Sequence, residues 1–193
     1  MKNKTLFKKK KKEENKFILD ACCSSRMFWF NKKHPNTIFQ DIREEEKGFV
    51  NNRQNREIKP DIIGDFRNMS FKDKSFKLII WDPPHIIQKY NANCRMIAIY
   101  GSLEPETWQD DLKKGFNDIW RVLDDFGVLI FKWSEVDRWG QRKYSAKLKD
   151  IIRLFHTEPL IAQKVKWTKD NQFATYWCCF MKIPKGSDNV VYG

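Results

Sequence analysis

Short, continuous apolar runs occur along this chain, and each ends in polar or turn-forming residues. A strand buried on both faces is typically a continuous apolar run, whereas a strand with one solvated face alternates apolar and polar side chains. The runs therefore predict a mostly parallel sheet with helices on either side. They are Phe17–Leu19, Thr37–Phe39, Asp61–Ile63, Leu78–Trp81, Val128–Phe131, Leu160–Ala162 and Tyr176–Phe180.

Apolar residues repeated at three- and four-residue spacing predict two helices. The first spans Pro105–Leu123, where acidic neighbours of Pro105 favour a start and Gly127 marks the exit. The second spans about Tyr144–Phe155. The polar segment Arg43–Lys59 is interpreted as a long loop or a broken helix.

The order of these elements predicts a single α/β domain, because strands and helices alternate along the chain. The connection between the last two strands, Thr168–Ala174, is too short for a crossover helix, so this pair should be antiparallel. We therefore expect a folded domain over 17–184, with a disordered basic tail over 1–16 and a C-terminal tail over 185–193.

The chain is strongly basic, with 37 Lys and Arg against 25 Asp and Glu and a formal net charge of +12. An unbroken lysine run, Lys8–Lys12, lies in the N-terminal tail, and such a block predicts disorder. A solubilising tail and a weak electrostatic anchor on nucleic acid are both compatible with it. No apolar stretch approaches the roughly 20 residues of a spanning helix, and no signal peptide is recognisable. We expect a cytoplasmic protein that does not bind membranes.

The five cysteines indicate neither zinc nor disulfides. They occur as two adjacent pairs, Cys22-Cys23 and Cys178-Cys179, and as the single Cys94. There is no C-x-x-C motif and no histidine at ligand spacing, so no metal site is predicted. Neighbouring residues of a strand point to opposite faces, so neither pair should bridge internally. Reduced, mostly buried thiols are expected.

The strongest chemical signal is Asp82-Pro83-Pro84-His85, which directly follows the apolar run Leu78–Trp81. Ligands of such sheets bind at the carboxyl ends of strands, so Asp82 should project into a cleft. The prolines remove backbone donors and restrict the loop, which leaves the Asp82 and Pro83 carbonyls as acceptors. Two acceptors suit an aromatic amine, since they can bond its N–H groups and aim its lone pair at an electrophile.

This segment resembles the motif of class I amino-methyltransferases, in which Asp or Asn precedes two prolines and an aromatic residue or histidine. The family includes the N6-adenine and N4-cytosine DNA methyltransferases, and other members act on RNA bases or glutamine side chains. The resemblance covers roughly 17–184 and implies a Rossmann-like fold, a seven-stranded sheet and S-adenosyl-L-methionine as cofactor. The implied catalytic residues are Asp82, Pro83, Pro84 and His85, with His85, usually an aromatic residue in the family, contacting the target.

Three further strand ends resemble the cofactor motifs of this family. Asp20 would contact the methionine part directly or through water, Asp41 the ribose hydroxyls, and Asp65 the adenine amino group. Small residues replace the usual glycines after Asp20, and the short connection to the second strand leaves room for one or two helical turns over 27–33. The implied cofactor-binding residues are Asp20, Ala21, Cys22, Cys23, Ser24, Asp41, Ile42, Asp65 and Phe66.

Target recognition has no separate domain in this sequence. The candidates are the inserted segments 86–104 and 133–143, and the second combines basic and aromatic residues that suit phosphates and bases. The implied substrate-binding residues are Arg138, Trp139, Arg142 and Lys143.

The sequence thus predicts a methyltransferase for an exocyclic amino group of a nucleic-acid base, with adenine N6 in DNA expected first and cytosine N4 second. In duplex DNA the base would be flipped out. A protein partner or a homodimer is a candidate supplier of target recognition. Two alternatives stay open: an RNA-base or protein methyltransferase of the same fold, and a non-catalytic module that binds nucleic acid or cofactor.

Overall fold

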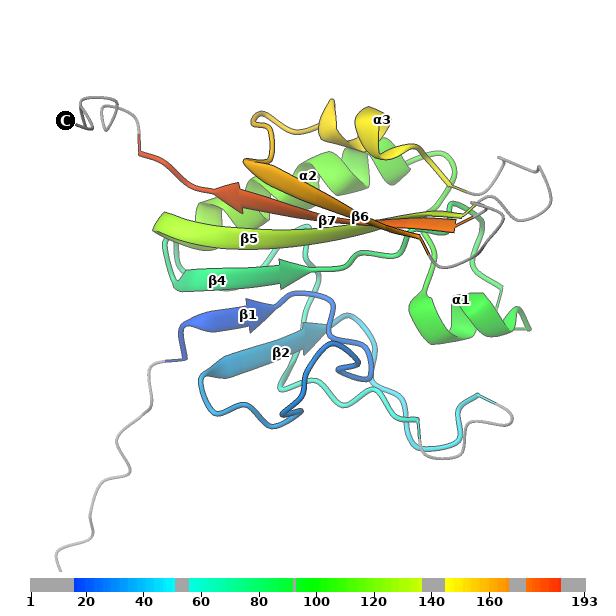
Figure 1. Ribbon diagram of the computed structural model, residues 1–193. Helices are drawn as coiled ribbons and strands as arrows, with labels where there is room; N and C mark the ends of the chain where they lie inside the picture. Colours follow the sequence, from blue (N-terminus) through cyan, green and yellow to red (C-terminus); the bar gives the residue numbers. More distant parts are fainter. Residues whose placement is uncertain (1–15, 51–55, 92, 137–144, 167–172, 185–193) are drawn as a thin grey trace, which may run out of the picture.

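The computed structural model describes residues 16–50, 56–91, 93–136, 145–166 and 173–184. Seven strands form one sheet (Figure 1). They are β1 (Ile18–Asp20), β2 (Thr37–Asp41), β3 (Ile62–Ile63), β4 (Phe76–Trp81), β5 (Leu123–Val136), β6 (Ile161–Lys166) and β7 (Phe173–Met181). The helices of the described residues are α1 (Arg95–Tyr100), α2 (Trp108–Val122) and α3 (Leu148–Ile152).

The strand order is β3-β2-β1-β4-β5-β7-β6. All neighbouring pairs from β3 to β5 are parallel, and β7 is antiparallel to both β5 and β6. This confirms the predicted mostly parallel sheet with an antiparallel C-terminal pair. The chain runs outward from β1 to β3 and then returns to β4 beside β1. Ligands of open α/β sheets bind at such a reversal of strand order, outside the carboxyl ends of the strands.

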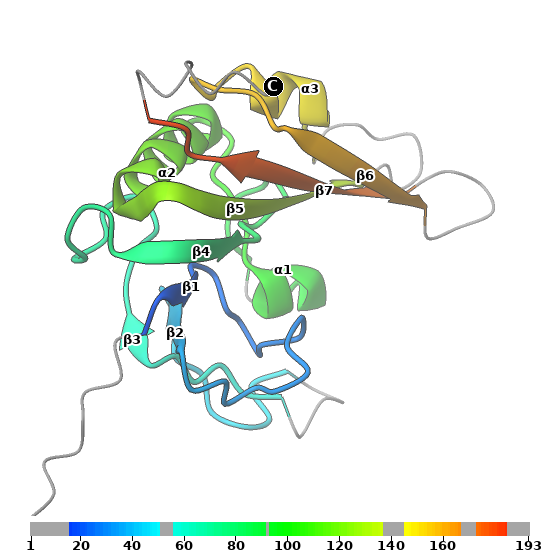
Figure 2. The same ribbon diagram turned by 60° about the vertical axis from the view of Figure 1, so that its left-hand side comes forward.

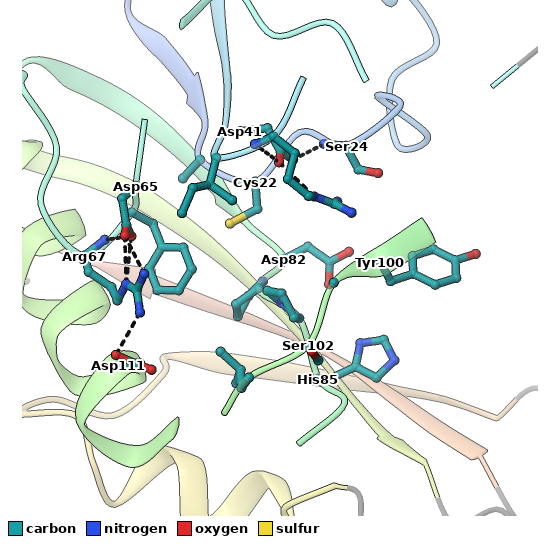
Figure 3. A pocket seen from close by; sticks show the side chains of 18 of the residues that line it. Cys22, Ser24, Asp41, Asp65, Arg67, Asp82, His85, Tyr100, Ser102 and Asp111 are labelled. Carbon is teal, nitrogen blue, oxygen red and sulfur yellow. Dashed lines mark hydrogen bonds and ion pairs between the residues drawn. The ribbon is translucent and has the colours of Figure 1, made fainter. Parts of the chain in front are cut away.

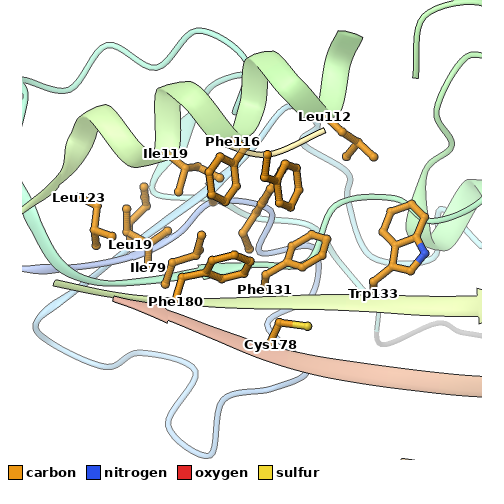
Figure 4. Packing of buried hydrophobic residues seen from close by; sticks show 14 of the residues in the cluster. Leu19, Ile79, Leu112, Phe116, Ile119, Leu123, Phe131, Trp133, Cys178 and Phe180 are labelled. Atoms are coloured by element: carbon orange, nitrogen blue, oxygen red, sulfur yellow. The ribbon is translucent and has the colours of Figure 1, made fainter. Parts of the chain in front are cut away.

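The main core lies between the sheet and the helices α2 and α3, which cover the same face (Figures 1, 2 and 4). Phe116 of α2 is fully buried and stacks on Phe155, which follows α3, with ring centroids 4.0 Å apart. The Phe180 ring of β7 packs edge-on against Phe116 from the sheet side, with ring centroids 5.4 Å apart. The apolar stripe predicted for the first helix is therefore the stripe that forms the core.

The helices expected on the second side of the sheet are largely missing from the described residues, where the short helix α1 lies apart from α2 and α3 (Figures 1 and 2). Ile79 and Leu129 face α2 and are fully buried, whereas their neighbours Ile80 and Ile130 are only half-buried on the other face. The described parts of the connections β1–β2 and β2–β3 contain no helix. The continuous apolar runs predicted the strands correctly, but they did not reveal that the connections β1–β2 and β2–β3 are loops in their described parts.

The expected helical turns over 27–33 are also absent. Arg26 adopts a left-handed conformation with φ 55°. Its guanidinium donates to the backbone carbonyls of Lys32 and Lys59, both at 2.7 Å, and to the carboxylate of Asp61 at 2.9 Å. The Lys32 carbonyl accepts this bond from a side chain and not from the backbone of a helix. The segment is therefore a loop that the Arg26 side chain holds together.

The remaining differences concern the bounds of elements. α2 begins three residues after Pro105, and α3 covers only the central part of 144–155. The described parts of 43–59 form a loop in which Glu45 and Ile58 pair as an isolated bridge. Lys16, assigned to the tail, pairs with Asp61 at 3.3 Å, and the rest of both predicted tails lies outside the described residues. None of the described helices has the length and apolar character to cross a bilayer.

Candidate active site

A cavity of about 450 Å³ opens at the carboxyl ends of the strands β1 to β4. Figure 3 shows Asp82, His85 and Tyr100 toward one end, and Asp65 with Arg67 at the other. The structure therefore brings together the four predicted catalytic residues and most of the predicted cofactor residues. The predicted residues that line it are Ala21, Cys22, Ser24, Asp41, Ile42, Asp65, Phe66, Asp82, Pro83, Pro84 and His85.

Asp82 follows β4 and forms an ion pair with Lys132 of the neighbouring strand β5. The Lys132 ammonium donates to both carboxylate oxygens of Asp82, at 3.0 and 2.9 Å. The side chains keep exposed fractions of only 15% for Lys132 and 20% for Asp82. A carboxylate offers about four lone-pair positions, and this pair uses two, one on each oxygen. Asp82 can therefore accept further hydrogen bonds from a ligand in the cavity.

The charges beside Asp82 follow from burial. Burial raises the pKa of Asp82, and the Lys132 ammonium opposes that rise. Burial also lowers the pKa of His85 to about 4, and the positive charge of Lys132 adds to that effect. His85 is thus uncharged at neutral pH. Its ring lies edge-on to that of Trp133, with ring centroids 6.4 Å apart. A neutral, planar imidazole can stack on or hydrogen-bond to a target.

Asp41, at the end of β2, is held by the loop after β1. It accepts from the backbone N–H of Ser24 at 2.8 Å and from that of Arg43 at 3.0 Å. The Arg43 guanidinium donates in turn to the carbonyl of Ala98 in α1 at 3.1 Å. The neighbouring Ile42 is 57% exposed, so an apolar side chain stands open beside the predicted ribose acid.

Asp65 differs from its predicted role, because its carboxylate is already occupied by Arg67. The Arg67 backbone N–H and side chain make four contacts with the two oxygens, at 2.6 to 2.9 Å. Burial acts to raise the pKa of Asp65, yet these hydrogen bonds lower it overall. Arg67 also donates to Asp111 of α2 at 3.0 Å. A ligand amino group that bonds Asp65 would therefore compete with Arg67.

Asp20 lies behind the cavity lining, with an exposed fraction of only 2%. It accepts from the indole N–H of Trp29 at 2.8 Å and from the backbone N–H of Cys22 at 3.4 Å. Burial raises its pKa to about 7. Cys23 is likewise buried outside the lining. The contact of Asp20 with the cofactor stays a prediction; in the structure Asp20 bonds the backbone of Cys22, which itself lines the cavity.

The segment after β4 supplies residues that sequence reasoning did not identify. Tyr90, Tyr100 and Ser102 line the cavity, and the buried Ser102 hydroxyl has no hydrogen-bond partner among the described residues. Gly101 has φ 76°, and a Cβ there would lie 3.1 Å from the Pro84 ring. The sequence predicted the segment 86–104 as a candidate for target recognition, but it singled out none of these residues. The predicted substrate residues Arg138, Trp139, Arg142 and Lys143 lie outside the described residues.

Comparison with known proteins identifies the fold. The sequence matches no protein-family model and no curated protein. Among solved structures, a SAM-dependent methyltransferase from Methanosarcina mazei aligns with a TM-score of 0.53 and 12% identity, over 89% of this chain and 94% of that one.

Two further structures give similar alignments. An N-methyltransferase, NodS from Bradyrhizobium japonicum, aligns with a TM-score of 0.50 and 12% identity, over 86% of this chain and 85% of that one. A protein from Pyrococcus horikoshii aligns with a TM-score of 0.50 and 15% identity, over 86% of this chain and 81% of that one. With the strand order and the antiparallel C-terminal pair, these alignments show the Rossmann-like fold of class I methyltransferases.

Proposed function

We propose that this chain is an S-adenosylmethionine-dependent methyltransferase that acts on an exocyclic amino group of a nucleic-acid base, adenine N6 in DNA first. The observation that carries the proposal is that Asp82 and Pro83 line the same cavity as Asp41 and Ile42, on a sheet with the methyltransferase strand order. The first pair suits the amine that accepts the methyl group, and the second suits the nucleoside part of the methyl donor. The sites for donor and acceptor molecules therefore adjoin.

The charge and shape of the cavity fit S-adenosylmethionine, which when bound supplies an electrophilic methyl group on a positively charged sulfur. Six carboxylates line the cavity against two arginines, so its formal charge favours a cation. They are Asp41, Glu45, Asp65, Asp82, Glu104 and Asp111. The volume of about 450 Å³ falls within the usual range of small-molecule sites. Asp41 would hold the ribose hydroxyls, and Ile42 and Phe66 would pack against the adenine ring.

The chain's own groups would activate the target amine by orientation and charge. The Asp82 carboxylate accepts one N–H with a lone pair that Lys132 leaves unused. Among the described residues no donor bonds to the Pro83 carbonyl, which is therefore available for the second N–H. Both bonds strengthen as the nitrogen becomes positive, so they stabilise the transition state more than the ground state. His85 and Tyr100 offer planar faces for the base.

Nucleic acid as substrate is supported by the net charge of +12, since phosphates attract a basic protein. DNA is proposed on the strength of the Asp82-Pro83-Pro84-His85 resemblance. A protein partner or a second copy of the chain is the proposed source of sequence recognition. An RNA base or a protein side chain is the alternative acceptor, and the same experiment distinguishes them.

The test is mass spectrometry of nucleosides after incubation of the purified chain with S-adenosylmethionine and DNA or RNA. N6-methyladenine in DNA is the expected product. Asp82→Ala should reduce its formation by about 10²- to 10³-fold, the usual effect of removing one transition-state contact, while calorimetry still detects cofactor binding.

A second variant controls for a loss of activity that is caused by misfolding and not by the missing carboxylate. Asp82→Ala leaves the Lys132 ammonium without its partner, so the double variant Asp82→Ala/Lys132→Met, which removes both charges, is measured beside it. Methylation at the wild-type rate by either variant would refute the role of Asp82. A wild-type chain that binds the cofactor and methylates RNA but not DNA would have RNA as its substrate. A chain that binds the cofactor but modifies neither nucleic acid would leave a protein side chain as the acceptor. Absence of cofactor binding would leave the non-catalytic alternative.

A further inference from the structure

A second hollow, of about 740 Å³, lies beside the loop between β1 and β2. Ser24 lines both this hollow and the candidate active site, so the two adjoin. Its lining is rich in positive charge: five cationic side chains and one histidine face two carboxylates. The basic residues are Lys16, Arg26, Lys32, Lys33, His34 and Lys59.

The positive charge of the hollow is not neutralised within the described residues. Asp61 pairs with both Lys16 and Arg26, so one carboxylate serves two cations. Lys32, Lys33 and Lys59 form no ion pair with any other described residue. The surface is therefore complementary to a chain of phosphates rather than to a single neutral ligand.

The same loop presents aromatic residues to solvent. Phe30 is fully exposed, and Phe28 is 38% exposed. A large exposed aromatic has no role in the core of this domain, and it lies two residues before Lys32. Exposed aromatics beside cations are the arrangement with which proteins bind single-stranded nucleic acid, because bases stack on the rings while phosphates meet the cations.

The loop also reaches the candidate catalytic residues. The Phe28 ring lies 4.9 Å from the Lys132 ammonium and packs edge-on against Trp177 at 5.1 Å. Lys132 in turn bonds both oxygens of Asp82. A single strand of nucleic acid bound to this loop would thus lie beside the proposed methylation site.

We infer that the loop 26–34 and the basic hollow beside it form a binding surface for single-stranded nucleic acid, with Phe30 as a stacking platform and Lys32, Lys33 and Lys59 as phosphate contacts. The inference names the partner surface of the proposed reaction, and it rests on that function only for the role of Asp82. Binding itself needs no methyl transfer.

The test measures fluorescence anisotropy of the full-length chain with labelled oligo(dT) of about 12 nucleotides, within the usual site sizes of roughly 4–16. Thymine has no exocyclic amino group, so this probe cannot accept the methyl group in the proposed reaction. Phe30→Ala should weaken binding by about 5- to 150-fold, the usual contribution of one stacked base. Lys32→Ala/Lys33→Ala should reduce the slope of log affinity against log salt by about 1.4, or about 0.7 for each lost phosphate contact.

Matched controls remove the same groups elsewhere on the surface. Phe126→Ala deletes another exposed phenylalanine, and Lys113→Ala/Lys114→Ala deletes two exposed lysines of α2. Neither control should change the affinity more than twofold, an allowance of about 0.4 kcal/mol. Every variant keeps the lysine run at 8–12, whose contribution is therefore constant.

The outcomes separate this inference from the proposed function. Wild-type affinity of Phe30→Ala, or equal losses in the two lysine pairs, would overturn the binding surface. A heparin fragment bound as tightly as oligo(dT) would identify a general polyanion surface and would also overturn it. If the chain binds oligo(dT) as described but methylates no nucleic acid, the proposed function fails and the binding surface stands.

Discussion

The ion pair between Lys132 and Asp82 makes a quantitative prediction about stability. Lys132→Met keeps most of the side-chain volume but leaves a buried carboxylate without its cation. Removing one partner of a buried ion pair typically costs about 3–5 kcal/mol. Since both side chains retain some exposure, we expect a loss near the lower end, about 3 kcal/mol. For a chain of this length the melting temperature should fall by about 6–12 °C.

The loss should depend on pH with a definite sign. Burial already raises the pKa of Asp82, and removing Lys132 raises it further. The folded variant then binds a proton more tightly than the unfolded chain, so its unfolding free energy decreases as pH rises above the unfolded value of about 3.9. The difference from the wild type should be largest at about pH 8 and smaller at about pH 5.

Urea unfolding followed by circular dichroism at both pH values measures this difference. The control is Asp82→Asn/Lys132→Met, which removes both charges and should recover much of the loss, because no buried charge is left unpaired. A loss below about 1 kcal/mol in Lys132→Met, typical of an exposed pair, would refute our reasoning. So would a loss that does not change with pH.

Two further predictions concern groups behind the cavity. The pKa of Asp20 is raised to about 7, so its contribution to stability should decline as pH rises from about 4 to about 7; the melting temperature of Asp20→Asn should therefore rise relative to that of the wild type between about pH 4 and about pH 8. A difference in melting temperature between the two proteins that stays constant across this pH range would contradict the raised pKa of Asp20. Gly115→Ala would place a Cβ 2.4 Å from the Phe66 ring, so it should cost about 1–3 kcal/mol and weaken cofactor binding measured by calorimetry. Unchanged cofactor affinity would show that Phe66 moves away from the cavity without effect.

The sheet and the outline of the site could be predicted because they depend on local patterns. An apolar run that ends in an acid marks both a strand and its carboxyl end, and Asp20, Asp41, Asp65 and Asp82 occur in the order of β1 to β4. Parallel strands bring such ends to one edge of the sheet, so their proximity needed no further information.

The partners of these acids could not be predicted, because they depend on strand register and on loop conformation. Trp81 pairs with Phe131, so the next residues along both strands, Asp82 and Lys132, come side by side. A lysine between two aromatic residues of a strand was the available signal, since a cation within an apolar run usually has a buried partner. Which strand supplies that partner follows only from the register.

The hydrogen bonds of the two end acids decide how the cavity can be used. Three N–H groups of Arg67 contact the two oxygens of Asp65, one of them shared between both oxygens, whereas the Lys132 ammonium makes one contact with each oxygen of Asp82. Asp82 therefore keeps more capacity to accept a hydrogen bond from a ligand amine than Asp65, where such an amine would compete with Arg67, which also donates to Asp111. The end of the cavity at Asp82 is thus the better acceptor for an amine, and we expect the predicted contact of Asp65 with the cofactor to be weaker because Arg67 competes for it.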